Sequence, residues 1–330
     1  MNETMNLCQS FAFEAEGTKL ISPCLMFEVF VYFAEGPEVL DFYQRVREAL
    51  GNLLTHYDTG SGRSSKITAR SETLMPTWCN NPTPWPKKQY CLLMGGAAAD
   101  IGATAASMRI DFNCRASHPT IFPRTSLYCT IPLDHPLAQK DAFADWVTQL
   151  KVFKDGYFIS GSCGLGLNFP YNFPSHELHI ETINRVSSLL LRYPGLDVQS
   201  IMLGIGLTLM QRDQEFIDRH QKNKGRPYLK RVNWLTFLNE DQIDLLGGMP
   251  ALKEQFLDVS EIKLRELAHG VCIQAGSSPE LGSSADADYI PLYQKVAKAV
   301  RTVRLDTVKG GALPSEFRHN GVLDWLNAFD

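Results

Sequence analysis

Continuous apolar runs alternate along the chain with segments of helical periodicity. The run from Cys24 to Phe33 is apolar almost throughout and ends at Glu35-Gly36-Pro37, a pattern typical of a buried strand. From Pro37 to Leu54 apolar residues recur at helical spacing, and Pro37 stands where a helix would begin. The folded part of the chain is therefore predicted to open with a strand and an amphipathic helix.

The same two patterns continue to the end of the chain. Ser175 is a predicted N-cap for a long helix that Pro194-Gly195 ends, with Ile180 and Ile183 among its inward-facing residues. Further strands are predicted at Tyr90–Met94, Thr104–Asn113, Thr125–Leu133, Gly156–Asn168, Asp197–Leu209, Leu229–Leu238, Val259–Leu267 and Val271–Ala275. Further helices are predicted at Pro136–Phe153, at Asn239–Phe256, at Tyr289–Val300 and around Trp325. The helix at Asn239–Phe256 is predicted to break at Gly247-Gly248.

Two segments lack either pattern. Residues from His56 to Lys66 are rich in Gly and Ser and predict a surface loop. Between Met75 and Lys88 several prolines surround Trp78 and Trp85, which predicts a rigid loop that is neither helix nor central strand. Structural filling and a contact surface are both open as roles for this aromatic loop.

The order of the elements favours an α+β fold with mostly antiparallel sheet and packed helices, because several strands follow one another without a crossover helix. Two stretches, Thr125–Asn168 and Leu229–Leu267, share an order of strand, helix, strand. Two similar sub-domains, with a boundary near residues 170–195, are therefore one form that this fold could take. Residues 1–23 are interpreted as an N-terminal extension and residues 24–330 as the α+β domain.

Composition and charge narrow the classes of function. The 330 residues are 44% hydrophobic and carry 32 Lys and Arg against 36 Asp and Glu, so the chain has the material for a core and no basic excess for nucleic-acid binding. The segment Met1–Ser10 lacks the charge and apolar run of a signal peptide, and no apolar window is long enough to span a membrane. A cytoplasmic protein with no direct nucleic-acid or membrane partner is expected.

Residues with catalytic or metal-binding potential do not form a familiar motif. The eight cysteines include no C-x-x-C pair and are predicted to be mostly buried small hydrophobes. His176 and His179 are three apart, whereas zinc proteases place their two histidines four apart. The glycines of Gly161–Gly166 fit neither a nucleophile elbow nor a phosphate loop and indicate close backbone packing. No enzyme, metal or cofactor is predicted; a hydrolase that uses His135 or the His176/His179 region is the alternative.

Several segments carry a resemblance to a known family. They include the helix Arg185–Tyr193 with Pro194-Gly195, the stretches Val232–Leu238, Leu245–Gly248 and Cys272–Gly276 with Pro279–Gly282, and the segments Tyr289–Val303 and Trp325–Asp330. Over most of the chain beyond residue 24 the sequence resembles a bacterial family of type VI secretion immunity proteins. The resemblance implies a cognate effector toxin as partner, a DNase with a restriction-endonuclease-like domain, neutralised by a stoichiometric complex that covers or distorts its active site.

A nuclease presents a basic groove, so carboxylates and aromatic anchors are the candidate contact residues. Each group of acidic residues is equally well explained as an ordinary solvated surface. The candidates are Asp213, Glu215 and Asp218, then Glu240, Asp241 and Asp244, then Glu280, Asp286 and Asp288, and the aromatic residues Trp78 and Trp85.

Overall fold

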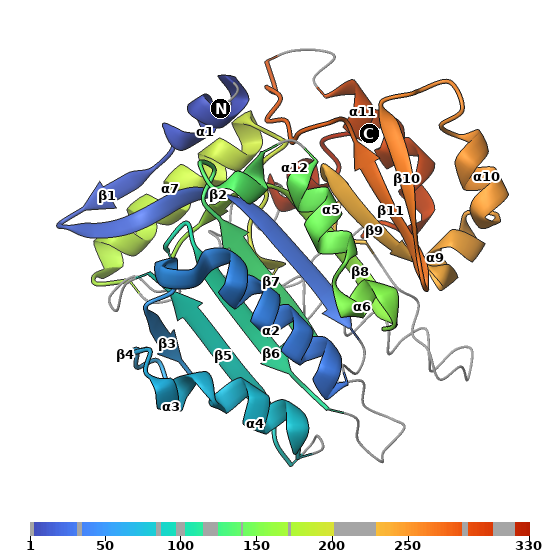
Figure 1. Ribbon diagram of the computed structural model, residues 1–330. Coiled ribbons are helices and arrows are strands. Elements are labelled where there is room, and N and C mark those ends of the chain that lie inside the picture. Colours follow the sequence, from blue (N-terminus) through green and yellow to red (C-terminus); the bar gives the residue numbers. More distant parts are fainter. Residues whose placement is uncertain are drawn as a thin grey trace.

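One antiparallel sheet runs through the described part of the chain, and helices pack on it (Figure 1). The structure is a computed structural model that describes residues 3–31, 35–83, 87–96, 103–114, 125–139, 141–170, 173–200, 229–285, 290–305 and 321–330. The predicted α+β class with a mostly antiparallel sheet is confirmed. The division into two similar sub-domains stays a prediction.

Within the described residues the sheet has 11 strands in the order β10-β11-β9-β8-β2-β7-β6-β5-β3-β4, with β1 paired to β2. Neighbouring strands are antiparallel throughout this order. The strands are β1 (Phe13–Ala15), β2 (Thr18–Val31), β3 (His56–Asp58), β4 (Ser65–Lys66), β5 (Tyr90–Gly95), β6 (Ser107–Phe112), β7 (Thr125–Ile131), β8 (Phe158–Asn168), β9 (Leu235–Asn239), β10 (Ile262–Leu267) and β11 (Gly270–Ala275).

The helices connect these strands and cover the sheet. Short 3-10 turns are labelled η. The helical elements are α1 (Glu3–Gln9), α2 (Gly36–Leu50), η1 (Gly51–Leu53), α3 (Ala69–Glu72), α4 (Leu74–Asn80), η2 (Pro136–Ala138), α5 (Ala142–Thr148), α6 (Lys151–Lys154), α7 (His176–Arg192), α9 (Glu240–Leu245), α10 (Gly248–Glu254), α11 (Pro291–Ala299), η4 (Arg301–Val303) and α12 (Val322–Leu326).

Strand β2 lies in the middle of the sheet and fixes both halves to each other. Leu25 pairs with Ile131 of β7 on one side and with Leu165 of β8 on the other. The predicted strand from Cys24 is therefore real, and it begins earlier, at Thr18. It extends toward the N-terminus because β1 folds back on it and adds cross-strand hydrogen bonds.

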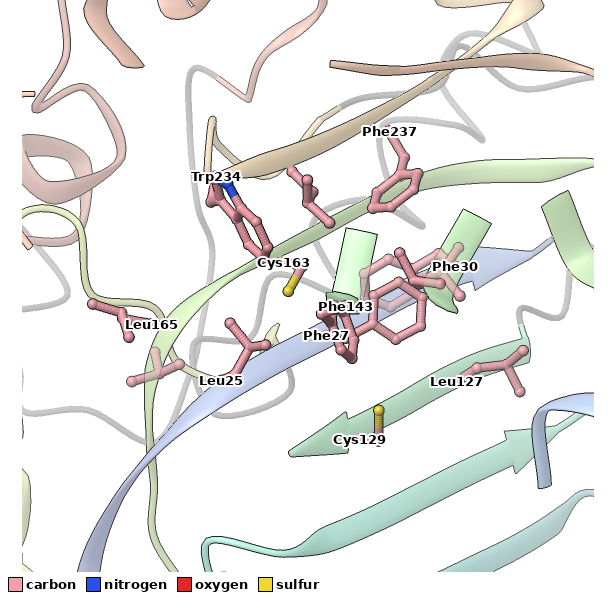
Figure 2. Close-up of a cluster of buried hydrophobic side chains, with 14 of the residues drawn as sticks. Leu25, Phe27, Phe30, Leu127, Cys129, Phe143, Cys163, Leu165, Trp234 and Phe237 are labelled. Atoms are coloured by element: carbon pink, nitrogen blue, oxygen red, sulfur yellow. The ribbon is translucent and has the colours of Figure 1, made fainter. Parts of the chain in front are cut away.

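One face of the sheet is apolar and lies under α2, α5 and α6 (Figure 1). Phe27 is at its centre, with its ring centroid 6.0 Å from Phe143 and 6.0 Å from Phe237 (Figure 2). Phe153 of α6 stacks on Phe237 at 4.5 Å. Aromatic pairs at these separations add to the stability that the buried area alone provides.

The opposite face of the sheet carries both polar and apolar side chains. Residues that are paired across an antiparallel sheet lie on the same face. Glu28 pairs with Tyr128 of β7 and with Ser162 of β8, so a carboxylate, a phenol and a hydroxyl stand together on it. The glycines of β8 admit close neighbours here: a Cβ on Gly164 would overlap the amide of Asn233, and one on Gly166 would lie 2.7 Å from Met26 Cβ. Close packing is confirmed as the reason for these glycines.

Some local predictions were wrong. The helix predicted at Pro136–Phe153 is broken into η2, α5 and α6, since Leu150 is extended and Lys151 N–H donates to Asp41 Oδ2 of α2 at 2.8 Å. Ile180 of α7 is 47% exposed, because the buried stripe runs through Leu178 and Thr182 instead. The strand predicted from Leu229 begins at Leu235.

The two predicted loops also contain regular structure. Residues His56–Lys66 include β3 and β4, which pair at the end of the sheet. Leu74–Asn80 forms α4 although Pro76 lies within it. Pro76 is the third helical residue, where a backbone N–H has no partner inside the helix, so proline costs no hydrogen bond there.

Candidate functional site

A cluster of buried charges lies on the mixed face of the sheet. Lys230 Nζ is 2.8 Å from Asp197 Oδ1 and 3.6 Å from Glu28 Oε2, and no side chain of the three is more than 9% exposed. Ser200 Oγ donates to Glu28 at 2.5 Å, and Asn233 Nδ2 donates to Asp197 at 2.9 Å. Burial raises the pKa of Glu28, against the attraction of Lys230 and the hydrogen bond from Ser200.

This cluster holds chain segments together. Asp197 and Lys230 come from irregular segments, while Glu28 comes from the central strand β2. Each charged group is paired or hydrogen-bonded by its neighbours, as buried charges must be if the fold is to tolerate them. The arrangement is thus a structural tie between the sheet and two irregular segments.

The end of the chain is fixed to the same region by Arg231. Its guanidinium donates to the carbonyl groups of Pro194 and Leu196 and lies 4.1 Å above the Trp325 ring. Trp325 Nε1 also donates to Leu196 at 3.0 Å. The segments that carry the family resemblance at Pro194-Gly195 and Trp325–Asp330 therefore meet, and they meet as packing residues.

His135, one of the residues proposed for the alternative hydrolase, has both ring nitrogens engaged. Nδ1 accepts from Leu137 N–H at 3.2 Å, and Nε2 lies 3.1 Å from the carbonyl oxygen of Ala49, to which it donates. This arrangement uses the neutral tautomer and leaves no ring nitrogen to take a proton from a substrate. His135 links η2 to the end of α2.

The other residues proposed for the hydrolase do not gather into a site. The rings of His176 and His179 are 6.3 Å apart, and His179 lies against Phe173 at 4.7 Å. Among the described residues no three His, Cys, Asp or Glu side chains come together as a metal site would require. The cysteines are free thiols, and burial raises the pKa of Cys79, Cys91 and Cys272 to about 12, far above that of a reactive thiol.

Helices α9 and α10 form an outer surface beyond β9 and β11, at the side of the sheet away from β4 (Figure 1). Gly247 and Gly248, at φ 93° and 88°, make the tight turn between them that an L side chain would strain. We call the exposed part of α9, α10 and the connection to β10 the α9–α10 surface. It carries the exposed residues Glu240, Asp244, Leu245, Glu254, Leu257, Asp258 and Glu261 and the half-buried Asp241.

The three predicted carboxylates on α9 have different surroundings. Glu240 Oε1 lies 2.8 Å from His269 Nδ1, and Asp241 accepts from the Tyr157 hydroxyl at 2.6 Å. Asp244 is exposed on the following turn. The structure thus places these three carboxylates on one helix, within the range Asn239–Phe256 that was predicted to be helical.

The other candidate contact residues are scattered or lie beyond the description. Burial raises the pKa of the half-buried Glu280, whose N–H donates to the Tyr293 hydroxyl at 3.2 Å. Trp78 packs on Tyr90 at 5.1 Å and contributes to the core. Residues Asp213, Glu215, Asp218, Asp286, Asp288 and Trp85 lie outside the described residues.

Two structural features were not predicted from the sequence. The pairing of Lys230 with Glu28 depends on contacts distant in sequence, which no spacing reveals. Leu257 follows the buried Phe256 and is 81% exposed. A helical projection that placed Leu252 and Phe256 inward would have placed Leu257 on the solvent side.

Comparisons with known proteins assign the class to which this fold belongs. The model of the family TsiV, described as type VI immunity for VRR-NUC, matches residues 38–327, so the chain belongs to this family. A solved structure, the Pseudomonas aeruginosa T6SS protein PA0821, shares the fold with a TM-score of 0.69 at 21% identity, over 96% of this chain and 84% of that one. No curated protein matches. Within the described residues, no helix has the length and apolar composition to cross a membrane.

Proposed function

We propose that the protein binds and neutralises a type VI effector that carries a VRR-NUC nuclease domain, through a stoichiometric complex. The observation that carries the proposal is the family match over residues 38–327. The immunity protein would act in the cytoplasm, where it meets the toxin before the toxin reaches chromosomal DNA. It would act by covering or distorting the nuclease active site and not by chemical transformation.

The physical character of the structure supports such a role. A broad sheet with a packed aromatic core provides a rigid support, so a binding surface on it loses little conformational entropy when a partner docks. The formal net charge of −4 favours encounter with a basic DNA-binding domain over encounter with DNA itself. His135, the best candidate base of the alternative hydrolase, is committed to structural hydrogen bonds.

The test is titration of the purified protein into a DNA-cleavage assay of the effector encoded beside its gene. Cleavage is expected to fall linearly and to end at an equimolar ratio, and co-expression should restore growth of cells that produce the effector. The protein alone should leave the DNA intact. Undiminished cleavage at a tenfold molar excess, together with no rescue of growth, would refute the proposal.

A further inference from the structure

The α9–α10 surface exposes two large apolar side chains. Leu257 is 81% exposed and Leu245 is 44% exposed, and among the large apolar side chains of the described residues none is as exposed as Leu257. When a partner covers a leucine that is exposed to water, the free energy of the complex is lowered, which favours binding. Exposed apolar residues with a polar rim are characteristic of protein interfaces.

The charge around these leucines is strongly unbalanced. From Glu240 to Glu266 the chain has seven carboxylates and three cations, an excess as large as the formal net charge of −4 of the whole protein. The three cations already have partners in Glu266, Asp141 and Asp145. The carboxylates of this segment are Glu240, Asp241, Asp244, Glu254, Asp258, Glu261 and Glu266.

The described residues compensate only some of these carboxylates. Lys295 of α11 pairs with Asp258 at 3.3 Å, and His269 contacts Glu240. Among the described residues, no cation lies within ion-pair distance of Asp244 or Glu254, one on each helix. The surface therefore keeps a negative potential that a cationic partner would neutralise.

Buried side chains and helix caps also hold the α9–α10 surface in place. Ile243, Leu252 and Phe256 are buried beneath it, and the Asn239 and Gln242 side chains cap α9 in both directions at 2.9 Å. A preorganised surface presents its anchor without a further ordering cost. The charges and the leucines thus have defined positions before any partner arrives.

We infer that the α9–α10 surface is where the toxin docks, with Leu257 as apolar anchor and Asp244 and Glu254 facing the basic DNA-binding side of the nuclease. This inference rests on the proposed function and specifies its contact surface. A basic nuclease groove is the occupant that the charge complementarity selects, since a neutral or acidic partner would leave Asp244 and Glu254 uncompensated in the interface.

The experiment measures the Kd of purified variants for the catalytically inactivated effector encoded beside the gene, at low and at moderate salt. Leu257→Ala is expected to raise Kd about 10- to 100-fold, as loss of an interface anchor does. The double variant Asp244→Lys/Glu254→Lys should lower the association rate at least about tenfold at low salt and reduce its salt dependence. Matched controls are Leu191→Ala on α7 and Glu48→Lys/Glu181→Lys on α2 and α7, which should bind like the wild type.

The outcomes separate the two proposals. If the wild type binds and both α9–α10 variants bind equally well, the docking surface is wrong while the immunity function stands. If the wild type neither binds nor inhibits, the proposed function itself fails. All substituted residues are exposed, so thermal melting within about 2 °C of the wild type confirms that a weakened variant is still folded.

Discussion

The ammonium group of Lys230 lies 2.8 Å from Asp197 Oδ1, in an interior where neither side chain is more than 5% exposed. Lys230→Met should lower the free energy of unfolding by about 3–5 kcal/mol, because it leaves the carboxylates of Asp197 and Glu28 buried without their cation. Urea denaturation at neutral pH measures the change. Lys295→Met, which removes an exposed pair with Asp258, is the control and should cost at most about 1 kcal/mol; equal losses would contradict a structural role for the buried cluster.

Stability should depend on pH through Glu28. Burial raises the pKa of Glu28 above its ordinary value of 4.5, so between pH 4.5 and this raised pKa the folded protein keeps a proton on the carboxyl that the unfolded chain has released. The contribution of Glu28 to stability is then greatest below pH 4.5 and declines as pH rises through the folded pKa. The free energy of unfolding of the wild type, compared with that of Glu28→Gln, should therefore fall from pH 4 toward pH 7. A difference that grows with pH would show that Lys230 overrides the effect of burial.

The contact between Gly164 and Asn233 leaves no room for a side chain. Gly164→Ala should lower the free energy of unfolding by about 3 kcal/mol, since the new methyl group would overlap the Asn233 amide. The same substitution in an Asn233→Ala background should cost less, because the obstructing amide is gone. A double-mutant cycle by chemical denaturation measures this coupling; an equal cost in both backgrounds would place the strain elsewhere.

Removal of the two histidines near the start of α7 should leave protection intact. The variant His176→Ala/His179→Ala is expected to inhibit the effector at the same equimolar ratio as the wild type, because neither residue belongs to a described metal site. Metal analysis of the purified wild type should find less than about 0.1 equivalents of zinc, far below the full occupancy of a structural site. Loss of inhibition, with bound zinc in the wild type only, would favour a metal-dependent mechanism.

The elements that the sequence predicted best are those with a local cause. Ser175 caps α7 by accepting from Leu178 N–H at 3.2 Å, and the break at Gly247-Gly248 separates α9 from α10 as expected. Capping, helix-breaking residues and apolar periodicity act over a few residues and can be read directly. Prediction failed where a contact distant in sequence ends a helix. At Leu150 the predicted helix breaks, because Asp41 of α2 accepts a hydrogen bond from the N–H of Lys151.

The candidate contact residues divide in a similar way. The helix predicted over Asn239–Phe256 was enough to place Glu240, Asp241 and Asp244 on one helix. The role of Trp78 in the core depends on Tyr90, which belongs to a separate strand. The exposure of Leu257 results from how α10 packs with Leu252 and Phe256 inward, which a helical projection of the sequence indicates and the structure shows in full.

The position of β2 has a consequence for how a cell acquires protection. This strand is translated early, yet its neighbours are completed only when the ribosome has passed Ile131 and Asn168, and β11, which lies next to the edge strand β10, ends at Ala275. Folds closed by such long-range pairing form slowly compared with local ones. A nascent chain therefore cannot complete this sheet until the ribosome has passed Ala275, so the proposed protective role would depend on chains that are already complete.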